Sequence, residues 1–388
     1  MCLRQTGVMK IQDVRLYPLW DKAIAGDWTS RFATENNQHT LVEVIADSGV
    51  CGMGSVFTST DLVLSSMKLL RPLLIGASAL DPLVVAEKLH QNTFWQGRGG
   101  AVTHAISGVD IALWDLFGRI TKQPVSRLLG GRFREVIKPY GSMLMAEPKE
   151  MRDRLQAGLA RGFKAFKIGW GPFGRRDAKM DEAIISTARE TVGPDVELMV
   201  DAGGSDAFWP HGYKWAINTA RMLAKYNPMW FEEALRPDDL AGFIKLREHS
   251  PVPISGGEVL TRRQSFIEWI EKGALDYIQP DVTKVGGLSE QHRIGQYADD
   301  HAIMMIPHGW NTGVGLAADL QLVAAAGNAR WVEYMTPAPL IEEVFQKPLQ
   351  MDANGNLKIP DGPGLGFDWN MDGIGRLSRG VSFTLSKL

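Results

Sequence analysis

From about residue 136 onward, the chain repeats one pattern: a short apolar strand, a turn, an amphipathic helix and another strand. Eight apolar segments fit the strands, and seven segments with apolar residues at helical spacing fit the helices between them. Such alternation is typical of a (β/α) barrel of about 200 residues. The competing open, doubly wound sheet usually has a glycine-rich turn after its first strand, and the segment VIKPYGSM is followed by none.

The chain of 388 residues is too long for one ordinary core, so a second structural unit is expected. Residues 9–60 alternate like strands, with a hairpin signal at the sequence Asp-Ser-Gly of positions 47–49, and residues 61–130 have helical periodicity. We therefore predict an α+β capping domain over residues 9–130 and a barrel over residues 131–340. Residues 341–388, which are rich in Gly, Pro and Asp, are expected to pack back on the cap.

Composition excludes several classes of protein. Acidic and basic residues number 44 and 42, so the net charge of -2 gives no indication of nucleic-acid binding. No apolar run has membrane-spanning length, and the N-terminus lacks the apolar core of a signal peptide. The only cysteines, Cys2 and Cys51, form no Cys-x-x-Cys pair, which excludes a disulfide framework and a zinc knuckle. We expect a cytoplasmic protein with two free thiols.

Ionisable residues occur near the carboxyl ends of seven consecutive predicted strands. The active site of a barrel lies at this end of its strands, and charged residues are rare in apolar strand ends without a partner or a metal. The residues in question are Lys167, Asp201, Glu232, Glu258, Asp281, His308 and Glu333. Each follows the one before it by about one βα unit, so all seven are expected on the same rim.

Three of these rim residues, Asp201, Glu232 and Glu258, are carboxylates on adjacent strands. Clustered carboxylates repel one another unless a cation lies between them. Oxygen ligands without Cys or His suit Mg²⁺. The sequence therefore predicts a Mg²⁺ site, and three separate salt bridges are the alternative interpretation.

Asp281 and His308 lie on neighbouring strands, where a carboxylate beside an imidazole makes a general acid or base. A buried, hydrogen-bonded pair without a catalytic role is the alternative. Lys167 is expected to bind a substrate carboxylate, to accept a proton or to form a salt bridge. Glu333 is expected to donate a hydrogen bond to an enolate oxygen when protonated, or to be structural. Loss of a proton α to a carboxylate creates a doubly charged enediolate, which a bound Mg²⁺ would stabilise.

Several motifs are similar to those of the enolase superfamily, in its mandelate racemase/muconate lactonizing enzyme family and mandelate racemase subgroup. The segment AISGVDIALWDLFGRITKQPVSRLLGG at residues 105–131 resembles the family's first signature. The segments LMVDA, WFEEA, SGGEV, IQPDVTKVGG and IPHGW resemble its barrel strands, in the same order. The resemblance covers nearly the whole chain.

The resemblance implies an α/β fold, with a modified (β/α)7β TIM-type barrel beneath an α+β N-terminal cap. It also implies that Asp201, Glu232 and Glu258 bind Mg²⁺, that His308 and Asp281 form the catalytic dyad and that Glu333 is the acid on the last strand. Two loops of the cap, at 20–31 and 57–60, are expected to close the pocket. The expected substrate contacts are Trp20, Arg31, Phe57 and Lys167.

Two positions depart from the family's pattern. Many members have Lys-x-Lys where this chain has Lys167-Ile168-Gly169, so the second lysine, a base on the face opposite the histidine, is missing. Gly203 stands where some dehydratases have a histidine. Asp206 and His211 in the following loop could substitute for that acid, although a role in a solvated loop is the preferred interpretation.

Charged residues outside the rim have their own expected roles. Arg175 and Arg176 could reach a distal carboxylate, although an exposed basic turn is the preferred interpretation. Lys284 is expected to supply supporting charge.

With one clear proton acceptor, racemisation is disfavoured. The expected reaction is dehydration of a sugar acid to a 2-keto-3-deoxy acid. The alternatives are opening of a lactone by a cycloisomerase, epimerisation, and a catalytically silent binding or structural protein. The expected partner is a small sugar acid or lactone rather than nucleic acid or membrane, and the resemblance implies a homo-oligomer.

Overall fold

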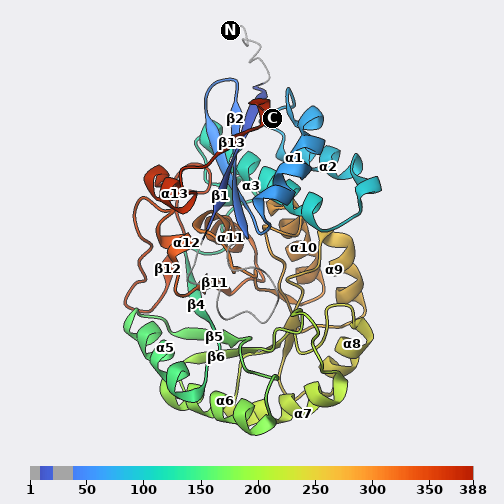
Figure 1. Ribbon diagram of the computed structural model, residues 1–388, viewed down its shortest axis with the longest axis vertical. Coiled ribbons are helices and arrows are strands. Elements are labelled where there is room, and N and C mark those ends of the chain that lie inside the picture. Colours follow the sequence, from blue (N-terminus) through green and yellow to red (C-terminus); the bar gives the residue numbers. More distant parts are fainter. Residues whose placement is uncertain (1–8, 21–37, 388) are drawn as a thin grey trace.

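The computed structural model describes residues 9–20 and 38–387 of the chain. Figure 1 shows an α+β cap at one end and, below it, a barrel whose helices form the outer wall. This architecture confirms the predicted fold class. The carboxyl ends of the barrel strands face the cap, and the pocket described below lies there.

The cap contains a four-stranded antiparallel sheet with the strand order β13-β1-β2-β3. Its strands are β1 (Ile11–Leu19), β2 (His39–Ala46), β3 (Cys51–Val56) and β13 (Phe383–Thr384). The predicted hairpin joins β2 to β3, and the Ala46 amide donates to the Val50 carbonyl across it at 2.9 Å.

The cap helices cover this sheet. They are α1 (Thr60–Leu74), α2 (Pro82–Gln91), the short 3-10 helix η1 (Phe94–Gln96), α3 (Ala101–Thr121) and α4 (Val125–Leu128). Helix α3 is buried along most of its length because it lies between two cores. Its Val109 and Leu113 pack in the core of the cap, whereas Ile111 and Trp114 pack in the core of the barrel.

Eight parallel strands form the barrel, in the order in which they occur along the chain, with the last beside the first. They are β4 (Val136–Leu144), β5 (Ala165–Gly169), β6 (Glu197–Asp201), β7 (Phe231–Glu232), β8 (Ile254–Gly256), β9 (Tyr277–Ile278), β10 (Met304–Met305) and β11 (Trp331–Met335). Strand β11 pairs with β4, and a parallel bridge between Met305 and Ala329 joins β10 to the segment before β11.

One helix follows each of the first seven strands, which gives the (β/α)7β order. These helices are α5 (Pro148–Ala160), α6 (Ala178–Val192), α7 (Tyr213–Leu223), α8 (Leu240–His249), α9 (Arg262–Glu271), α10 (Leu288–Asp300) and α11 (Gly313–Ala325). The 3-10 helix η2 (Ala224–Tyr226) extends α7. Helix α11 is buried along its whole length and is mostly apolar, as expected of a helix that lies between cap and barrel.

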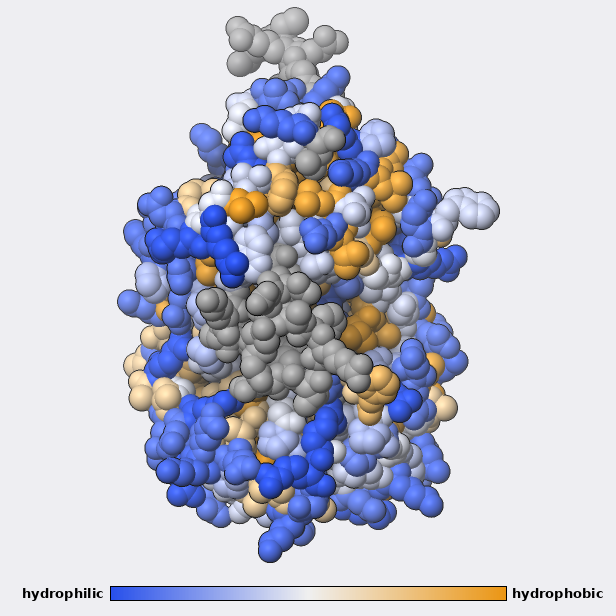
Figure 2. Space-filling view, viewed as in Figure 1, coloured by the Kyte–Doolittle hydropathy of each residue, from blue (hydrophilic) through white to orange (hydrophobic). Residues whose placement is uncertain are grey.

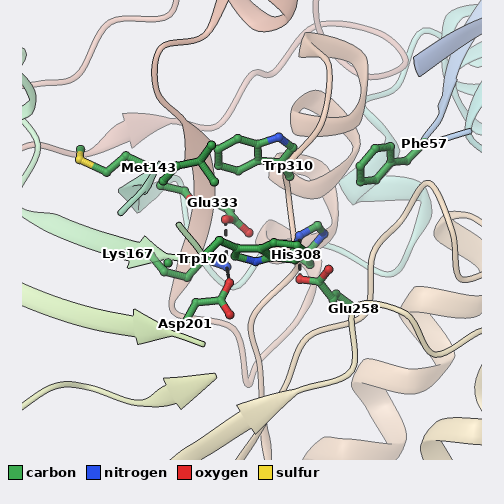
Figure 3. Close-up of a pocket in the computed structure, with 12 residues that line it drawn as sticks. Phe57, Met143, Lys167, Trp170, Asp201, Glu258, His308, Trp310 and Glu333 are labelled. Carbon is green, nitrogen blue, oxygen red and sulfur yellow. Dashed lines mark ion pairs between the residues drawn. The ribbon is translucent and has the colours of Figure 1, made fainter. Parts of the chain in front are cut away.

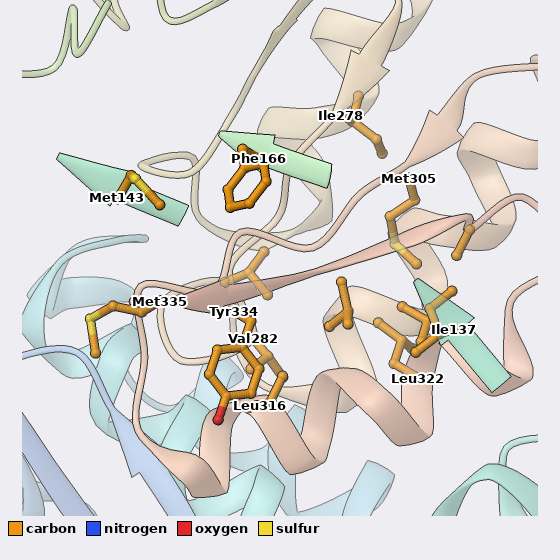
Figure 4. Close-up of a cluster of buried hydrophobic side chains, with 14 of the residues drawn as sticks. Ile137, Met143, Phe166, Ile278, Val282, Met305, Leu316, Leu322, Tyr334 and Met335 are labelled. Atoms are coloured by element: carbon orange, nitrogen blue, oxygen red, sulfur yellow. The ribbon is translucent and has the colours of Figure 1, made fainter. Parts of the chain in front are cut away.

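Figure 4 shows part of the barrel core, where Leu316 and Leu322 of α11 lie near β11 with Tyr334. Burial of each such side chain stabilises the fold by about 1.5–3 kcal/mol. One cluster of buried residues contains members of both the strands and the surrounding helices.

The C-terminal residues contact both parts of the molecule. They contain α12 (Pro339–Glu342), β12 (Leu357–Lys358), α13 (Met371–Leu377), β13 and the 3-10 helix η3 (Leu385–Lys387). Strand β12 pairs antiparallel with β4 of the barrel, and β13 pairs antiparallel with β1 of the cap.

The surface is mostly hydrophilic over the barrel helices, whereas apolar side chains gather on the cap near α1 and α2 (Figure 2). Leu62, Leu83 and Val84 are among the exposed apolar residues there. Within the described ranges, no helix combines the length and the apolar character needed to span a bilayer.

Candidate active site

The carboxyl ends of β6, β7 and β8 bring three carboxylates together. Asp201 and Glu232 are the last residues of β6 and β7, and Glu258 lies two residues beyond β8. One oxygen from each lies within 4.8 Å of the others, and all three residues are buried. The predicted metal ligands thus form one cluster.

Charge repulsion within this cluster is compensated in part by Lys167, the middle residue of β5. Its Nζ lies 2.6 Å from Oε1 of Glu232 and 3.9 Å from Oδ2 of Asp201. The other oxygen of Glu232 accepts hydrogen bonds from Trp230 and Gln279. Burial, together with the neighbouring Glu232 carboxylate, nevertheless raises the pKa of Asp201 well above its usual value. Burial and the repulsion from Glu232 are therefore not fully compensated by Lys167 at Asp201.

These three residues fit a divalent metal ion. They offer only carboxylate oxygens, the ligand type that Mg²⁺ prefers. A cation among them would offset both the burial and the repulsion that raise the pKa of Asp201.

The histidine–aspartate pair lies beside the carboxylates. The ring Nδ1 of His308 lies 2.7 Å from Oδ2 of Asp281, and its Nε2 lies 3.0 Å from Oε2 of Glu258 (Figure 3 shows His308 and Glu258). Asp281 Oδ1 accepts hydrogen bonds from the amide and hydroxyl of Thr283, at 2.7 and 2.6 Å. Asn311 is a further donor to it, at 3.3 Å. The carboxylate of Asp281 is therefore held from several sides, and the imidazole presents its Nε2 to the site.

The charges around the dyad determine its protonation. Burial would raise the pKa of Asp281, but Lys284 and His308 outweigh burial and hold this pKa below its usual value. Burial would likewise lower the pKa of His308, but the Glu258 carboxylate outweighs it and raises this pKa well above the usual value. This environment favours the protonated imidazole, whereas a cation held by Glu258 would offset the charge of that carboxylate and favour the neutral form that accepts a proton.

Glu333 on β11 is the last of the charged residues at this end of the barrel. Its Oε1 lies 3.0 Å from Lys167 Nζ. Its Oε2 accepts hydrogen bonds from the Gly309 amide at 2.8 Å and the Tyr140 hydroxyl at 3.2 Å. Burial would raise the pKa of Glu333, but Lys167 outweighs burial and lowers it. Lys167 therefore bridges Glu232 and Glu333.

A pocket opens above these charged residues, and its walls are largely aromatic and apolar (Figure 3). Phe57, Met143, Leu144, Trp170 and Trp310 form these walls, together with Ser142 and Gly169. The ring of Phe57 stacks on that of His39, with 4.6 Å between their centroids. On the barrel side, the Nζ of Lys284 lies 4.4 Å from the centre of the Phe57 ring.

The remaining predicted substrate contacts lie elsewhere or are not described. The Trp20 ring lies 4.9 Å from the guanidinium of Arg379, and its amide donates to the Leu377 carbonyl. Trp20 is thus directed toward the end of α13 rather than into the pocket. Arg31 lies outside the described residues.

The two departures from Lys-x-Lys and from the dehydratase histidine have a steric basis. A Cβ atom at Gly169 would lie 2.6 Å from the Cβ of Asp201. A Cβ atom at Gly203, where φ is 66°, would lie 2.7 Å from the ring of Trp170. Trp170 itself has a φ of 61°, which is strained for a tryptophan. Its ring therefore excludes any side chain at position 203.

Three loop residues that sequence analysis singled out, Arg175, Asp206 and His211, contact other residues of the loops. Arg175 forms an ion pair with Asp206 at 2.6 Å and stacks over Trp209. His211 Nε2 lies 2.6 Å from the Gly174 carbonyl oxygen. These contacts join the loops after β5 and β6 and do not bring the residues into the pocket lining.

The two other basic residues for which the sequence suggested a role are Arg176 and Lys284. Arg176 is half exposed and pairs with Glu147. Lys284, in contrast, is buried, with its Nζ 3.6 Å from Asp281 Oδ2 and 3.8 Å from Glu258 Oε1.

Sequence reasoning missed several residues of this site. Thr283 and Asn311 hold the Asp281 carboxylate, and Trp170 and Trp310 form the pocket walls. Each lies within three residues of a predicted site residue, so its proximity along the chain could have indicated it. The sequence does not indicate, however, in which direction each side chain points.

Comparison with known proteins places the chain in a family. Residues 23–130 match the "Mandelate racemase / muconate lactonizing enzyme, N-terminal domain", and residues 150–373 match the "Enolase C-terminal domain-like" family. The chain is 33% identical to D-galactarolactone cycloisomerase of Agrobacterium fabrum, over 94% of this chain and 98% of the relative. It is 32% identical to arabinonate dehydratase of Saccharolobus solfataricus, over 92% and 96%.

A solved structure resembles the whole fold. It is that of a racemase from Streptomyces coelicolor with bound magnesium, with a TM-score of 0.82 and 27% identity, over 95% of this chain and 99% of that one. The relatives thus include a dehydratase, a cycloisomerase and a racemase. The chain therefore belongs to the mandelate racemase/muconate lactonizing enzyme family of the enolase superfamily.

Proposed function

We propose that this protein is a Mg²⁺-dependent sugar-acid dehydratase in which His308 removes the α-proton of a hydroxy-carboxylate. The observation that carries the proposal is the orientation of His308. Its Nδ1 is held by Asp281, and its Nε2 lies among the carboxylates at the pocket floor. A base in this position adjoins the place where a substrate carboxylate would meet the cluster.

Asp201, Glu232 and Glu258 are the proposed ligands of Mg²⁺. When bound there, the ion would supply positive charge that offsets the second negative charge of the enediolate. Lys167 would bind the substrate carboxylate, since its ammonium group lines the pocket beside Glu232 and Glu333.

The proposed reaction balances as follows. His308 Nε2 takes the α-proton, and the electron pair of the C–H bond remains on the substrate as the enediolate. This electron pair then forms a carbon–carbon double bond as the bond to the β-hydroxyl breaks. His308 returns its proton to the departing hydroxyl, so that water leaves. The enol product tautomerises to a 2-keto-3-deoxy acid.

The side of the pocket opposite His308 favours dehydration over racemisation. Racemisation requires a proton acceptor on each face, and the position of the second lysine is Gly169, in contact with Asp201. Trp170, which follows Gly169 in the lining of the pocket, has no basic side chain. Proton removal and return on the His308 face alone are sufficient for elimination.

A second candidate is cycloisomerisation of a sugar lactone, in which the ring oxygen leaves in place of the hydroxyl. The 33% identity to D-galactarolactone cycloisomerase over nearly the full length of both chains favours it. The same base and the same metal ligands would perform the first half of that reaction.

Both candidates can be tested in one screen of the purified protein with Mg²⁺ against aldonic acids, aldaric acids and their lactones. Formation of a 2-keto acid from an open-chain acid, detected as the semicarbazone by absorbance, supports dehydration. Formation of a 2-keto acid from a lactone, with opening of its ring, supports cycloisomerisation. Absence of both products across the library would contradict the proposed substrate class.

A further inference from the structure

The segment between β9 and α10 carries the dyad carboxylate Asp281 and ends at Gly287, before the first turn of α10. Residues 279–291 are all buried. Gly287 has no side chain with which to cap the helix. The first amides of α10 therefore need acceptors from elsewhere in the molecule.

The missing cap comes from the other domain. Asp110, on helix α3 of the capping domain, accepts a hydrogen bond from the Ser289 amide at 3.0 Å through Oδ1. Its Oδ2 accepts one from the Ser289 hydroxyl. A carboxylate in this position satisfies free amides and complements the positive end of the helix dipole. Asp110 is thus an N-cap that lies 179 residues away in sequence.

Two further residues of α3 hold the same segment. The hydroxyl of Ser107 accepts a hydrogen bond from the Gly286 amide at 2.8 Å. The indole Nε1 of Trp114 donates to the Ser289 hydroxyl at 2.9 Å. Residues 107, 110 and 114 lie on one face of α3, so a single helix of the cap fixes the end of this segment.

The other end of the segment is bonded to Asp281 itself. The amides of Lys284 and Val285 donate to the Asp281 carbonyl at 3.0 and 2.8 Å, and the amide of Thr283 donates to its carboxylate. The chain from Asp281 to Ser289 is therefore one hydrogen-bonded unit, attached at its far end to α3. A displacement of that end would be transmitted to the dyad carboxylate.

We infer that Asp110 is a positioning residue, through which the capping domain fixes Asp281 and hence the orientation of His308. This inference rests on the proposed function of the dyad. It adds a catalytic purpose to a contact between domains that otherwise would be only structural.

The chemistry of the contact supports a positioning role over simple packing. Burial, with a smaller contribution from the nearby Glu290, outweighs the hydrogen bonds from Ser289 and raises the pKa of Asp110 to about 7. A buried carboxyl is therefore held at a cost in solvation that an apolar side chain would not have. What the carboxyl provides, and an apolar side chain cannot, is two directed hydrogen bonds to Ser289.

The experiment compares Asp110→Ala, which removes both acceptors, with Asp110→Asn, which keeps one acceptor for the Ser289 amide. Leu113→Ala is the matched control, because Leu113 lies on the same helix but packs in the core of the cap. Hydrogen exchange of the peptide that contains residues 281–290 is measured by mass spectrometry. The kcat and KM are measured on the substrate found in the screen, or on α-proton exchange in D₂O.

For Asp110→Ala we expect faster exchange in this peptide and a kcat about 10- to 100-fold lower, as misplaced catalytic groups produce, with KM changed by less than about twofold. Asp110→Asn should recover part of both effects. Leu113→Ala should lower the melting temperature without either effect. Equal losses of kcat in Asp110→Ala and Leu113→Ala, or unchanged exchange in Asp110→Ala, would overturn the inference. If no substrate turns over, the proposed function fails, whereas the exchange measurement still reports on the attachment.

Discussion

The Nδ1 atom of His308 lies 2.7 Å from the Oδ2 atom of Asp281, across the ends of two neighbouring strands. The two residues also form a parallel β-bridge, so their backbones as well as their side chains are in register. Asp281 is fully buried, and its second oxygen is occupied by Thr283 and Asn311. The carboxylate is therefore in place to hold one orientation of the imidazole.

Replacement of Asp281 by Asn should lower kcat by about 10²- to 10⁴-fold, the range of general acid–base catalysis. The amide cannot stabilise the imidazolium that forms when His308 takes a proton. Keto-acid formation measures the effect. Asp319→Asn is the control, because burial raises the pKa of Asp319 well above its usual value and a neutral amide resembles the protonated acid. Near-normal kcat in Asp281→Asn would be evidence against the dyad.

Addition of Mg²⁺ should raise the melting temperature of the metal-free protein and restore activity after treatment with EDTA. A ligand at 100 times its Kd stabilises the folded state by about 2.7 kcal/mol. Glu232→Gln should lose both responses. Glu233→Gln should keep them, since Glu233 is also buried but bonds to Ser205 rather than to the cluster. A Glu232→Gln variant that still responds to Mg²⁺ would remove Glu232 from the ligand set.

Restoration of the family's second lysine should not create a racemase. In Gly169→Lys, the new Cβ atom would lie 2.6 Å from that of Asp201, so we expect weaker Mg²⁺ binding in calorimetric titration and lower activity. Gly375→Lys makes the same change where a Cβ atom has open space, and it should bind Mg²⁺ normally. New racemase activity with unchanged Mg²⁺ affinity in Gly169→Lys would show that the steric account is wrong.

The fold could be predicted from the sequence because strands and helices differ in the spacing of their apolar residues. The (β/α)7β order follows from the alternation of the two patterns. The rim residues were readable for the same reason, as parallel strands end at one edge of the barrel.

Contacts between segments that are distant in sequence could not be predicted from the sequence. Trp20 bonds to Leu377 after the C-terminal segment has returned to the cap, and Asp110 meets Ser289 only when α3 lies on the barrel. The direction of the Trp170 ring depends on a positive φ that propensity does not favour.

The stability of the protein should depend on pH partly through His90. Burial, followed by the charge of Arg262, lowers the pKa of His90 from 6.5 to about 3. Between these values the unfolded chain binds a proton that the folded protein does not, so stability is present above pH 6.5 and is lost as the pH falls toward 3. In His90→Gln, the free energy of unfolding should fall less over this window, as measured by urea denaturation. Parallel pH profiles of the variant and the unchanged protein would contradict this assignment.

Alanine at position 203 should disturb the pocket wall. A residue with a Cβ atom at this positive φ costs roughly 1–2 kcal/mol, and this Cβ atom would meet the Trp170 ring. We expect a lower melting temperature and a higher KM. Gly212→Ala, where no atom lies within 4 Å of the new Cβ, is the control and should change neither. An unchanged KM in Gly203→Ala would mean that the position of the Trp170 ring does not affect substrate binding.

The most direct test of the account is proton NMR in D₂O of a substrate from the screen, with the unchanged protein and with His308→Asn, both loaded with Mg²⁺. We expect the unchanged protein to break the α C–H bond and to form a 2-keto acid, either by loss of water or by opening of a lactone ring. We expect His308→Asn to bind Mg²⁺ equally well but to leave the α-proton in place. Continued loss of the α-proton in His308→Asn would contradict the assignment of His308 as the base.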